Sequence, residues 1–251
     1  MSKKPLGYIA YEGPSLLDGQ PIVVIINKID DASANDKTGA LVQSFIIRSD
    51  ISPIDALKTG DDASICGQCI HRPILAKQSG AAPCYVNVGR SVMAVYGAYL
   101  RGRYERVSLD TLAHKLAGKK LRIGTYGDPA AAPVATWQAL TQFTAGHVGY
   151  THQWQLPGFD HSAWSNLTMA SADNVHEHEQ ARDLGYRVFR VSIGLDKLAG
   201  EISCPASAEA GKKTTCDNCM LCGGTSKQAK NIVIADHAVG HKKRVIQLVA
   251  A

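Results

Sequence analysis

The residues of this 251-residue chain with the clearest potential for chemistry are its seven cysteines. Four lie near the end of the chain, at Cys204, Cys216, Cys219 and Cys222, and the last three are each separated by two residues. A run with this spacing, together with a Cys-Pro elsewhere in the chain, is typical of iron–sulfur ligation. Structural zinc sites more often use separated C-x2-C pairs. The spacing therefore favours a 4Fe-4S cluster, with zinc and unligated thiols as the alternatives.

A second group of thiols lies earlier in the chain, at Cys66, Cys69 and Cys84. Together with His71 they could complete a zinc site, whereas a histidine or non-protein fourth ligand would allow an iron–sulfur cluster. Some of them could also join the carboxyl-terminal cysteines on one cluster. Seven thiolates exceed the four that a single cubane needs, so we expect either two metal sites or several cysteines that bind none. The odd number argues against a disulfide framework.

Two further side chains are candidates for catalysis. Asp128 lies in a Gly-Asp-Pro segment and His152 follows an apolar stretch. Asp and Pro also favour turns for backbone reasons, so Asp128 could serve the turn alone. A histidine could donate to a cluster sulfide, ligate iron or move a proton, or it could be a core residue. His237 near the end of the chain is open to the same interpretations.

The elements that must position these residues follow a repeating order of short apolar strands and helices. After an early strand at 21–27 and a strand at 41–47, a long loop leads to Cys66. We expect further strands at 121–125, 147–151, 166–170, 186–192 and 231–235, with helices at 91–103, 110–116, 133–143 and 175–184. Strands of this length that alternate with helices predict βαβ units and a parallel sheet.

In folds of this class, ligands bind beyond the carboxyl ends of the parallel strands. Each of the six strands from 41–47 onward is followed by a candidate segment. We therefore expect one mouth formed by the Cys66–Cys84 loop, Tyr126–Pro129, His152, Asp173, Cys204–Cys222 and His237.

Six such units, with three cysteines after the first strand, resemble the partial barrel of radical S-adenosylmethionine enzymes. That resemblance implies a single α/β domain built as a partial (β/α)6 TIM-like barrel. Residues 1–40 would be an amino-terminal strand extension, 41–200 and 228–240 the barrel, and 201–227 a cysteine-rich insertion holding an auxiliary cluster.

The same resemblance assigns roles to individual residues. Cys66, Cys69 and Cys84 stand where the family has the three ligands of its 4Fe-4S cluster, although the family spacing is C-x3-C-x2-C. Its Gly-Gly-Glu-Pro segment, which binds the amino group of S-adenosylmethionine, corresponds to Tyr126, Gly127, Asp128 and Pro129. The implied catalytic residues are Asp128 and His152.

The chain also resembles, over most of its length, an uncharacterised family of phage-encoded and related bacterial proteins that carry a domain of unknown function. The resemblance rests on Lys58-Thr59-Gly60, Ile65–Cys69, His71-Arg72, Cys84–Asn87, Tyr126–Pro129, Tyr150–Trp154 and Cys204–Ser207. It implies a phage or prophage origin, and hence the host cytoplasm, and little about activity.

Composition and charge limit the partners. The formal net charge of +5 is mild and its lysines and arginines are scattered, which permits a nucleic-acid partner without indicating one. Met1–Pro5 begins no secretory segment, and no apolar run approaches the roughly 20 residues of a membrane helix. We therefore expect a cytoplasmic protein with a small-molecule or macromolecular substrate, an electron donor if the cluster is redox-active, and no membrane partner.

Overall fold

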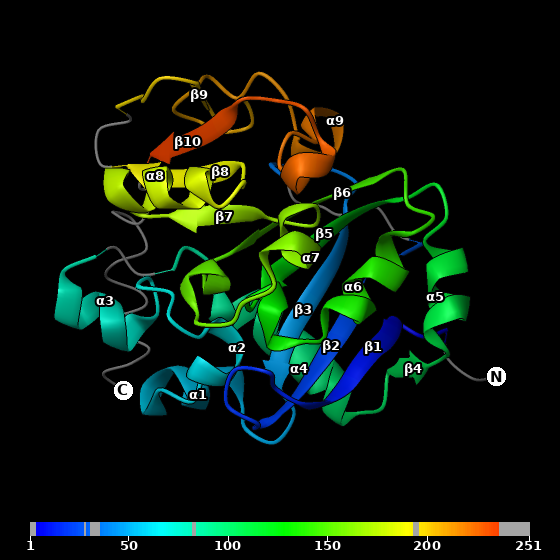
Figure 1. Ribbon diagram of the computed structural model, residues 1–251. Coiled ribbons are helices and arrows are strands. Elements are labelled where there is room, and N and C mark those ends of the chain that lie inside the picture. The colour runs from blue at the N-terminus through cyan, green and yellow to red at the C-terminus, as the bar shows by residue number, and fades with distance from the viewer. Residues whose placement is uncertain (1–3, 28, 31–35, 82–83, 193–195, 236–251) are drawn as a thin grey trace.

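A ten-stranded sheet is the centre of the computed structural model, which describes residues 4–27, 29–30, 36–81, 84–192 and 196–235 (Figure 1). The strand order is β4-β1-β2-β3-β5-β6-β7-β8-β10-β9. Only the β1–β2 and β2–β3 pairs are antiparallel among the described strands. The predicted α/β class is therefore confirmed, as a mixed and mostly parallel sheet.

The parallel part of the sheet contains the six strands expected from the sequence, in chain order and side by side. They are β3 (Val42–Arg48), β5 (Lys120–Tyr126), β6 (Gly146–Thr151), β7 (Met169–Ala172), β8 (Val188–Ser192) and β10 (Asn231–Ala235). Only β7 begins clearly later than predicted. The backbone N–H groups of Leu167 and Thr168 both donate to the carbonyl of Trp164, so these residues close the preceding helix instead of starting the strand.

The two ends of the sheet were only partly predicted. At one end, β1 (Gly7–Pro14) and β2 (Pro21–Asn27) form a hairpin, and β4 (Tyr104–Arg106) pairs with β1. At the other end, β9 (Glu201–Ser203) pairs with β10. β4 and β9 are three residues long and gave no alternating pattern to recognise. Because both are edges, the described strands form an open sheet.

The two faces of the parallel strands differ, as β5 illustrates. Leu121 and Ile123 are buried in the main apolar core together with Leu112, Trp137 and Leu140. Those partners come from α5 (Leu109–Lys115) and α6 (Val134–Thr141). The alternate residues Arg122 and Gly124 point to the opposite face, which lines a cavity. Helices α7 (His161–Ser165) and α8 (Val175–Asp183) connect β6, β7 and β8.

The segment between β3 and Cys84 was predicted as a loop, and this was wrong because it contains α1 (Pro53–Thr59), α2 (Ala63–Cys66) and α3 (Pro73–Ser79). A π-helical turn η1 (Val88–Val92) and α4 (Met93–Leu100) follow, and α4 lies within the helix predicted at 91–103. The Ser52 side chain caps α1, and Gly60 ends it with a φ of 88°. These helices have only one or two turns, so their apolar residues are too few to show a helical period in the sequence.

No helix within the described part of the chain combines the length and the apolar character needed to cross a membrane.

Candidate metal centre

A cavity of about 240 Å³ lies against the sheet face opposite α5 and α6. Inward-facing side chains of five strands form its floor, among them Arg122, Tyr150, Ser171, Phe189 and Ile232. All seven cysteines line its walls, namely Cys66, Cys69, Cys84, Cys204, Cys216, Cys219 and Cys222. The fold thus brings every predicted metal ligand to one cavity.

Within this cavity the thiols form two electrostatic groups. The thiol of Cys66 interacts with those of Cys69 and Cys84, whereas the thiol of Cys222 interacts with those of Cys204, Cys216 and Cys219. All seven are free thiols, and no three of their sulfur atoms lie within 4.8 Å of one another. No three of these thiols are therefore close enough to share one ion without movement of their side chains.

The first group is carried by the turn that follows α2. Cys66 is the last residue of α2, and Arg72 holds the turn by donating to the carbonyl of Gly67 at 3.0 Å. Arg72 also pairs with the buried Asp62 carboxylate at 2.8 Å. Cys84 is attached to the same turn because its backbone N–H donates to the carbonyl of His71 at 2.8 Å.

The Asp128 carboxylate fixes the neighbouring loops. It accepts four hydrogen bonds of 2.8–3.2 Å, from the backbone N–H groups of Ala130 and His152, Thr151 Oγ1 and Gln153 Nε2. A carboxylate has about four acceptor positions, so these donors use its capacity. Burial raises the pKa of Asp128, although the hydrogen bonds oppose this. In this structure Asp128 positions the site, and its catalytic role stays a prediction.

Gln153 extends this network to the cysteines. Its Nε2 also donates to the carbonyl of Cys66 at 3.0 Å, and its Oε1 accepts from the backbone N–H of Gln68 at 3.2 Å. Gly67 has a φ of 52°, and a Cβ there would lie 2.1 Å from Gln153 Oε1. The cysteine turn therefore needs glycine where it meets Gln153.

Three of the four predicted cofactor-binding residues reach the cavity, namely Tyr126, Gly127 and Asp128. Gly127 has a φ of 82°, and a Cβ there would lie 2.7 Å from Ile46 Cβ. Pro129 instead opens the short helix η2 (Pro129–Ala131), and its carbonyl accepts from Trp137 Nε1 at 2.8 Å. The segment is therefore a rigid turn whose first three residues line the cavity.

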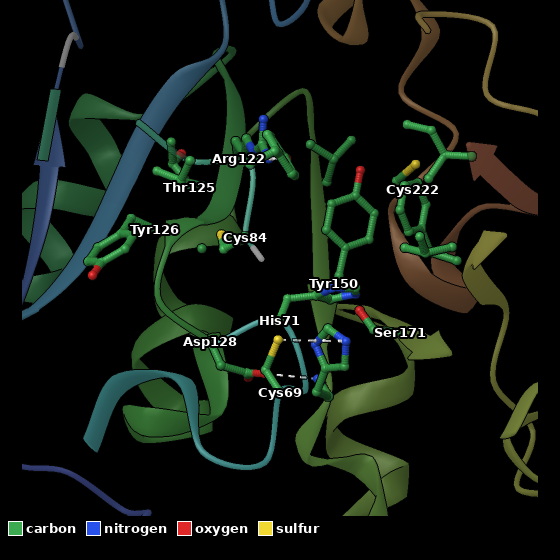
Figure 2. A pocket seen from close by; sticks show the side chains of 18 of the residues that line it. Cys69, His71, Cys84, Arg122, Thr125, Tyr126, Asp128, Tyr150, Ser171 and Cys222 are labelled. Atoms are coloured by element: carbon green, nitrogen blue, oxygen red, sulfur yellow. Dashed lines mark hydrogen bonds between the residues drawn. The ribbon is translucent and has the colours of Figure 1, made fainter. Parts of the chain in front are cut away.

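His152 lies where the sequence predicted it, directly beyond β6. Its Nε2 is 3.9 Å from Cys69 Sγ, a contact marked by the dashed line at the Cys69 sulfur in Figure 2. The same Nε2 is 3.3 Å from Asp173 Oδ2. Burial opposes a charged imidazole, but Cys69 and Asp173 raise the pKa of His152 well above its ordinary value. Burial likewise opposes a Cys69 thiolate, yet His152 and His71 lower the pKa of Cys69. The two side chains favour a thiolate–imidazolium pair.

No protein-family model, curated protein or solved structure matches this chain. The resemblances noted in the sequence therefore stay expectations. The function is therefore inferred from the geometry of the cavity.

The second cysteine group lines the same cavity as Cys66 and His152, as expected, but it reaches the cavity from another side. Cys216 and Cys219 bound the short helix α9, which lies beside the starts of the parallel strands, whereas α2 and α3 lie at their opposite ends (Figure 1). The Lys120 ammonium at the start of β5 donates to the carbonyl of Asp217 at 2.6 Å. The expectation that this segment would lie at the carboxyl ends of the strands is therefore wrong for Cys216 and Cys219.

The direction of the strands explains this position. β9 and β10 are parallel, so the chain must return from the end of β9 to the start of β10. The cysteine segment makes this return along the cavity side of the sheet. Arg187 ties it down at the far end by donating to four backbone carbonyls, those of Leu221, Gly224, Ala229 and Lys230.

Arg122 and Tyr150, both on the cavity floor, were not predicted as site residues. Arg122 donates to the Tyr85 hydroxyl at 2.8 Å, but its buried Nε has no hydrogen-bond partner. Burial opposes its charge, yet the phenols of Tyr85 and Tyr150 and the thiol of Cys216 raise its pKa. An arginine inside the otherwise apolar strand 121–125 was the signal for an inward charge. His237 lies outside the described residues.

Proposed function

We propose that this protein binds iron–sulfur clusters in the cavity. Cys204, Cys216, Cys219 and Cys222 would hold a 4Fe-4S cluster as four protein ligands. Cys66, Cys69 and Cys84 would hold a second cluster as three. The observation that carries the proposal is that seven cysteines from distant parts of the chain line one cavity in two groups.

The spacing of the sulfur atoms supports clusters over zinc. Four thiolates around one zinc ion at about 2.3 Å would lie about 3.8 Å apart in tetrahedral geometry. No three of the cysteine sulfurs are within 4.8 Å of one another. In a cubane each cysteine binds a different iron, so the ligand atoms are farther apart than around a single ion.

The raised pKa values of several cysteines in the cavity mean that a bound metal would be needed to keep them as thiolates. Burial raises the pKa of Cys84 to about 11 and that of Cys222 to about 12, so without a metal these groups are neutral. Metal binding requires their deprotonation. The Arg122 guanidinium, electrostatically coupled to Cys216, would offset part of the resulting negative charge.

When bound, the clusters would supply one-electron transfer. The chain's own residues would position the cysteine ligands. Gln153 and Asp128 hold the first cysteine turn, and Arg187 holds the second cysteine segment. The sheet keeps both groups at one cavity. The three-cysteine group leaves one ligand position for a molecule that enters the cavity, which favours an enzyme over a simple electron carrier.

The finer version of this proposal is a radical S-adenosylmethionine-like enzyme on a partial (β/α)6 barrel. It is supported by six parallel strands in chain order, a cavity on the face away from α5 and α6, and three cysteines after β3. In this version the Asp128 carboxylate is not available to the cofactor, because it already accepts four hydrogen bonds. An ammonium group would have to find acceptors other than that carboxylate.

The position of the second cysteine group favours a structural part for its metal. The cysteine segment is the return connection between β9 and β10, and it also contacts β5 and β6. A metal there would connect the β10–β9 edge of the sheet to its central strands β5 and β6. This alternative, a metal-stapled protein without catalysis, applies to Fe-S and zinc alike.

The direct test is metal analysis of the full chain after anaerobic reconstitution. We expect about eight irons and eight acid-labile sulfides per chain, with visible thiolate-to-iron charge-transfer absorption. The pair Cys216→Ser and Cys219→Ser should lose one half of this content, and the pair Cys69→Ser and Cys84→Ser the other half. Stoichiometric zinc without iron would refute the proposal.

The enzymatic version needs its own measurement. An electron paramagnetic resonance spectrum of the reduced protein should change when S-adenosylmethionine is added, and the solution should then contain 5′-deoxyadenosine. If neither occurs while the iron content is as expected, the cofactor is excluded and cluster binding is retained.

A further inference from the structure

One group of side chains in the cavity is suited to metal binding without any thiolate. His71, His152 and Asp173 each offer a ligand atom, and these atoms lie within 4.8 Å of one another. No other three His, Cys, Asp or Glu residues in the described ranges come as close. The Nε2 atoms of His71 and His152 are 2.9 and 3.3 Å from different oxygens of the Asp173 carboxylate.

These separations match the edges of a coordination shell. First-row metal ions bind imidazole nitrogen at about 2.0–2.1 Å and carboxylate oxygen at about 2.0–2.2 Å, using zinc as the reference. Two ligands at such distances are about 3.0 Å apart in an octahedron and about 3.4 Å apart in a tetrahedron. An ion could therefore be accommodated with small movements of the three side chains.

The fold places the three residues together for a simple reason. His152 and Asp173 directly follow β6 and β7, which are parallel neighbours, so both lie at the same edge of the sheet. His71 comes from the turn after Cys69. Both imidazoles line the cavity, whereas the Asp173 side chain is only 8% exposed and lies outside the lining. Free coordination positions would consequently face the cavity.

The geometry argues against a nucleophilic role for Cys69 with the same partners. In a Cys-His-Asp relay one ring nitrogen faces the nucleophile and the other faces the carboxylate. Here Cys69 Sγ and Asp173 Oδ2 both approach Nε2 of His152. The relay geometry is therefore absent.

We propose that His71, His152 and Asp173 form a mononuclear site for a divalent first-row metal ion, separate from the thiolate clusters. Two histidines and one carboxylate with open positions are the ligand set of non-haem iron(II) sites, and harder ions such as Mn²⁺ also accept it. The site would present its ion to a molecule bound in the cavity.

Mn²⁺ is a suitable probe because thiolates bind it poorly compared with softer ions. The full chain, freed of metal by a chelator under anaerobic conditions, would be titrated with Mn²⁺ while the free ion is followed by electron paramagnetic resonance. We expect one ion per chain, with nitrogen hyperfine coupling from two imidazoles. Asp173→Asn and His71→Gln should weaken Mn²⁺ binding at least about tenfold. Even the loss of a residue that only hydrogen-bonds to a metal ligand lowers metal affinity about 10–100-fold.

A matched control is the exposed pair His114 and Asp110, whose Nδ1 and Oδ1 atoms are 3.6 Å apart without a third ligand. Asp110→Asn should bind Mn²⁺ like the wild type. Wild-type protein without saturable binding would overturn the proposal. So would binding that survives Asp173→Asn, or bound Mn²⁺ without imidazole coupling.

Folding and the cluster proposal are tested separately. Circular dichroism of each variant would report folding, and the hyperfine measurement on wild-type protein stands if a variant fails to fold. Iron and acid-labile sulfide would be measured in the same variants after reconstitution. Absence of clusters with Mn²⁺ binding intact would refute only the cluster proposal, and the reverse result would refute only this site.

Discussion

Cys69 differs from the other cysteines of the cavity in its charge environment. His152 and His71 lower its pKa below the ordinary value of 9.0 against the effect of burial. Burial instead raises the pKa of Cys66, Cys84 and Cys222. Only the thiolate is the nucleophile, so thiolate character decides which cysteine reacts.

We therefore predict that Cys69 is alkylated before Cys84 and Cys222 in metal-free, reduced protein. Because its pKa is lowered, the thiolate fraction of Cys69 should rise at a lower pH than that of Cys84 or Cys222. Labelling with iodoacetamide over a pH series, followed by peptide mass spectrometry, measures this order. His152→Gln should shift the labelling of Cys69 to higher pH. Equal rates for all three cysteines would contradict the predicted pKa order.

Asp128→Asn should destabilise the fold, because an amide nitrogen would replace one oxygen that now accepts two hydrogen bonds. Buried donors left without an acceptor cost about 1–3 kcal/mol each, so we expect the free energy of unfolding to fall by about 3 kcal/mol. Urea unfolding of metal-free protein measures it. Asp160 is the control, since its exposed carboxylate also caps a helix by accepting from Ala163 N–H. Asp160→Asn should cost much less, and equal losses would show that burial does not matter.

At the level of elements, the sequence predicted the strands well and the segments between them less well. Strands such as β2 and β10 consist of apolar β-branched residues, and their limits agree with the prediction. Helices α1 and α3 were missed although each begins with a proline and is followed by a glycine, at Pro53 and Gly60 and at Pro73 and Gly80. Proline at the first helical position and glycine beyond the last were the usable signal.

The candidate site was predicted in its residue types but not in its arrangement. Cys66, His152 and Asp173 do lie beyond the carboxyl ends of strands, because that rule depends only on strand direction. The position of Cys216 depends on the strand order β8-β10-β9, which follows from the three-residue edge strand. The acceptors of Asp128 and the contact between His71 and Asp173 arise from tertiary packing, which local sequence does not encode.

The Arg187 side chain connects strand β8 to the second cysteine group through hydrogen bonds. Arg187→Met keeps the length of the side chain but removes all four hydrogen bonds to the carbonyls of the cysteine segment. We expect the free energy of unfolding to fall by about 3 kcal/mol, because hydrogen bonds from charged groups contribute about 1.5–3 kcal/mol each and do not add. Urea unfolding and the iron content of the reconstituted variant are the measurements.

The control for this variant is Arg182→Met on the exposed side of α8, which should change stability by less than about 0.5 kcal/mol. If Arg187→Met were as stable as Arg182→Met and kept all its iron, the cysteine segment would not depend on this anchor.

At the scale of the whole molecule, the cavity connects two regions of different composition. The side chains of Ile22, Val24 and Ile26 in β2 are fully buried in the main apolar core. In the cysteine-bearing segments 63–81, 84–87 and 204–226, the Arg72 and Arg187 side chains donate to backbone carbonyls. Since a bound metal contributes free energy of folding to its own surroundings, metal loss should affect these segments first.

We predict that removal of metal increases amide hydrogen exchange in 63–87 and 204–226 at least about tenfold, while β2, β3 and β5 keep their protection, because only the segments depend on metal for order. Exchange followed by mass spectrometry on reconstituted and metal-free protein measures this. The pair Cys216→Ser and Cys219→Ser should open 204–226 and leave 63–87 protected, since the two thiol groups hold separate metals. A uniform rise over all strands would mean that one cooperative unit depends on the metal. If both segments opened in the double variant, the seven cysteines would instead belong to one metal centre.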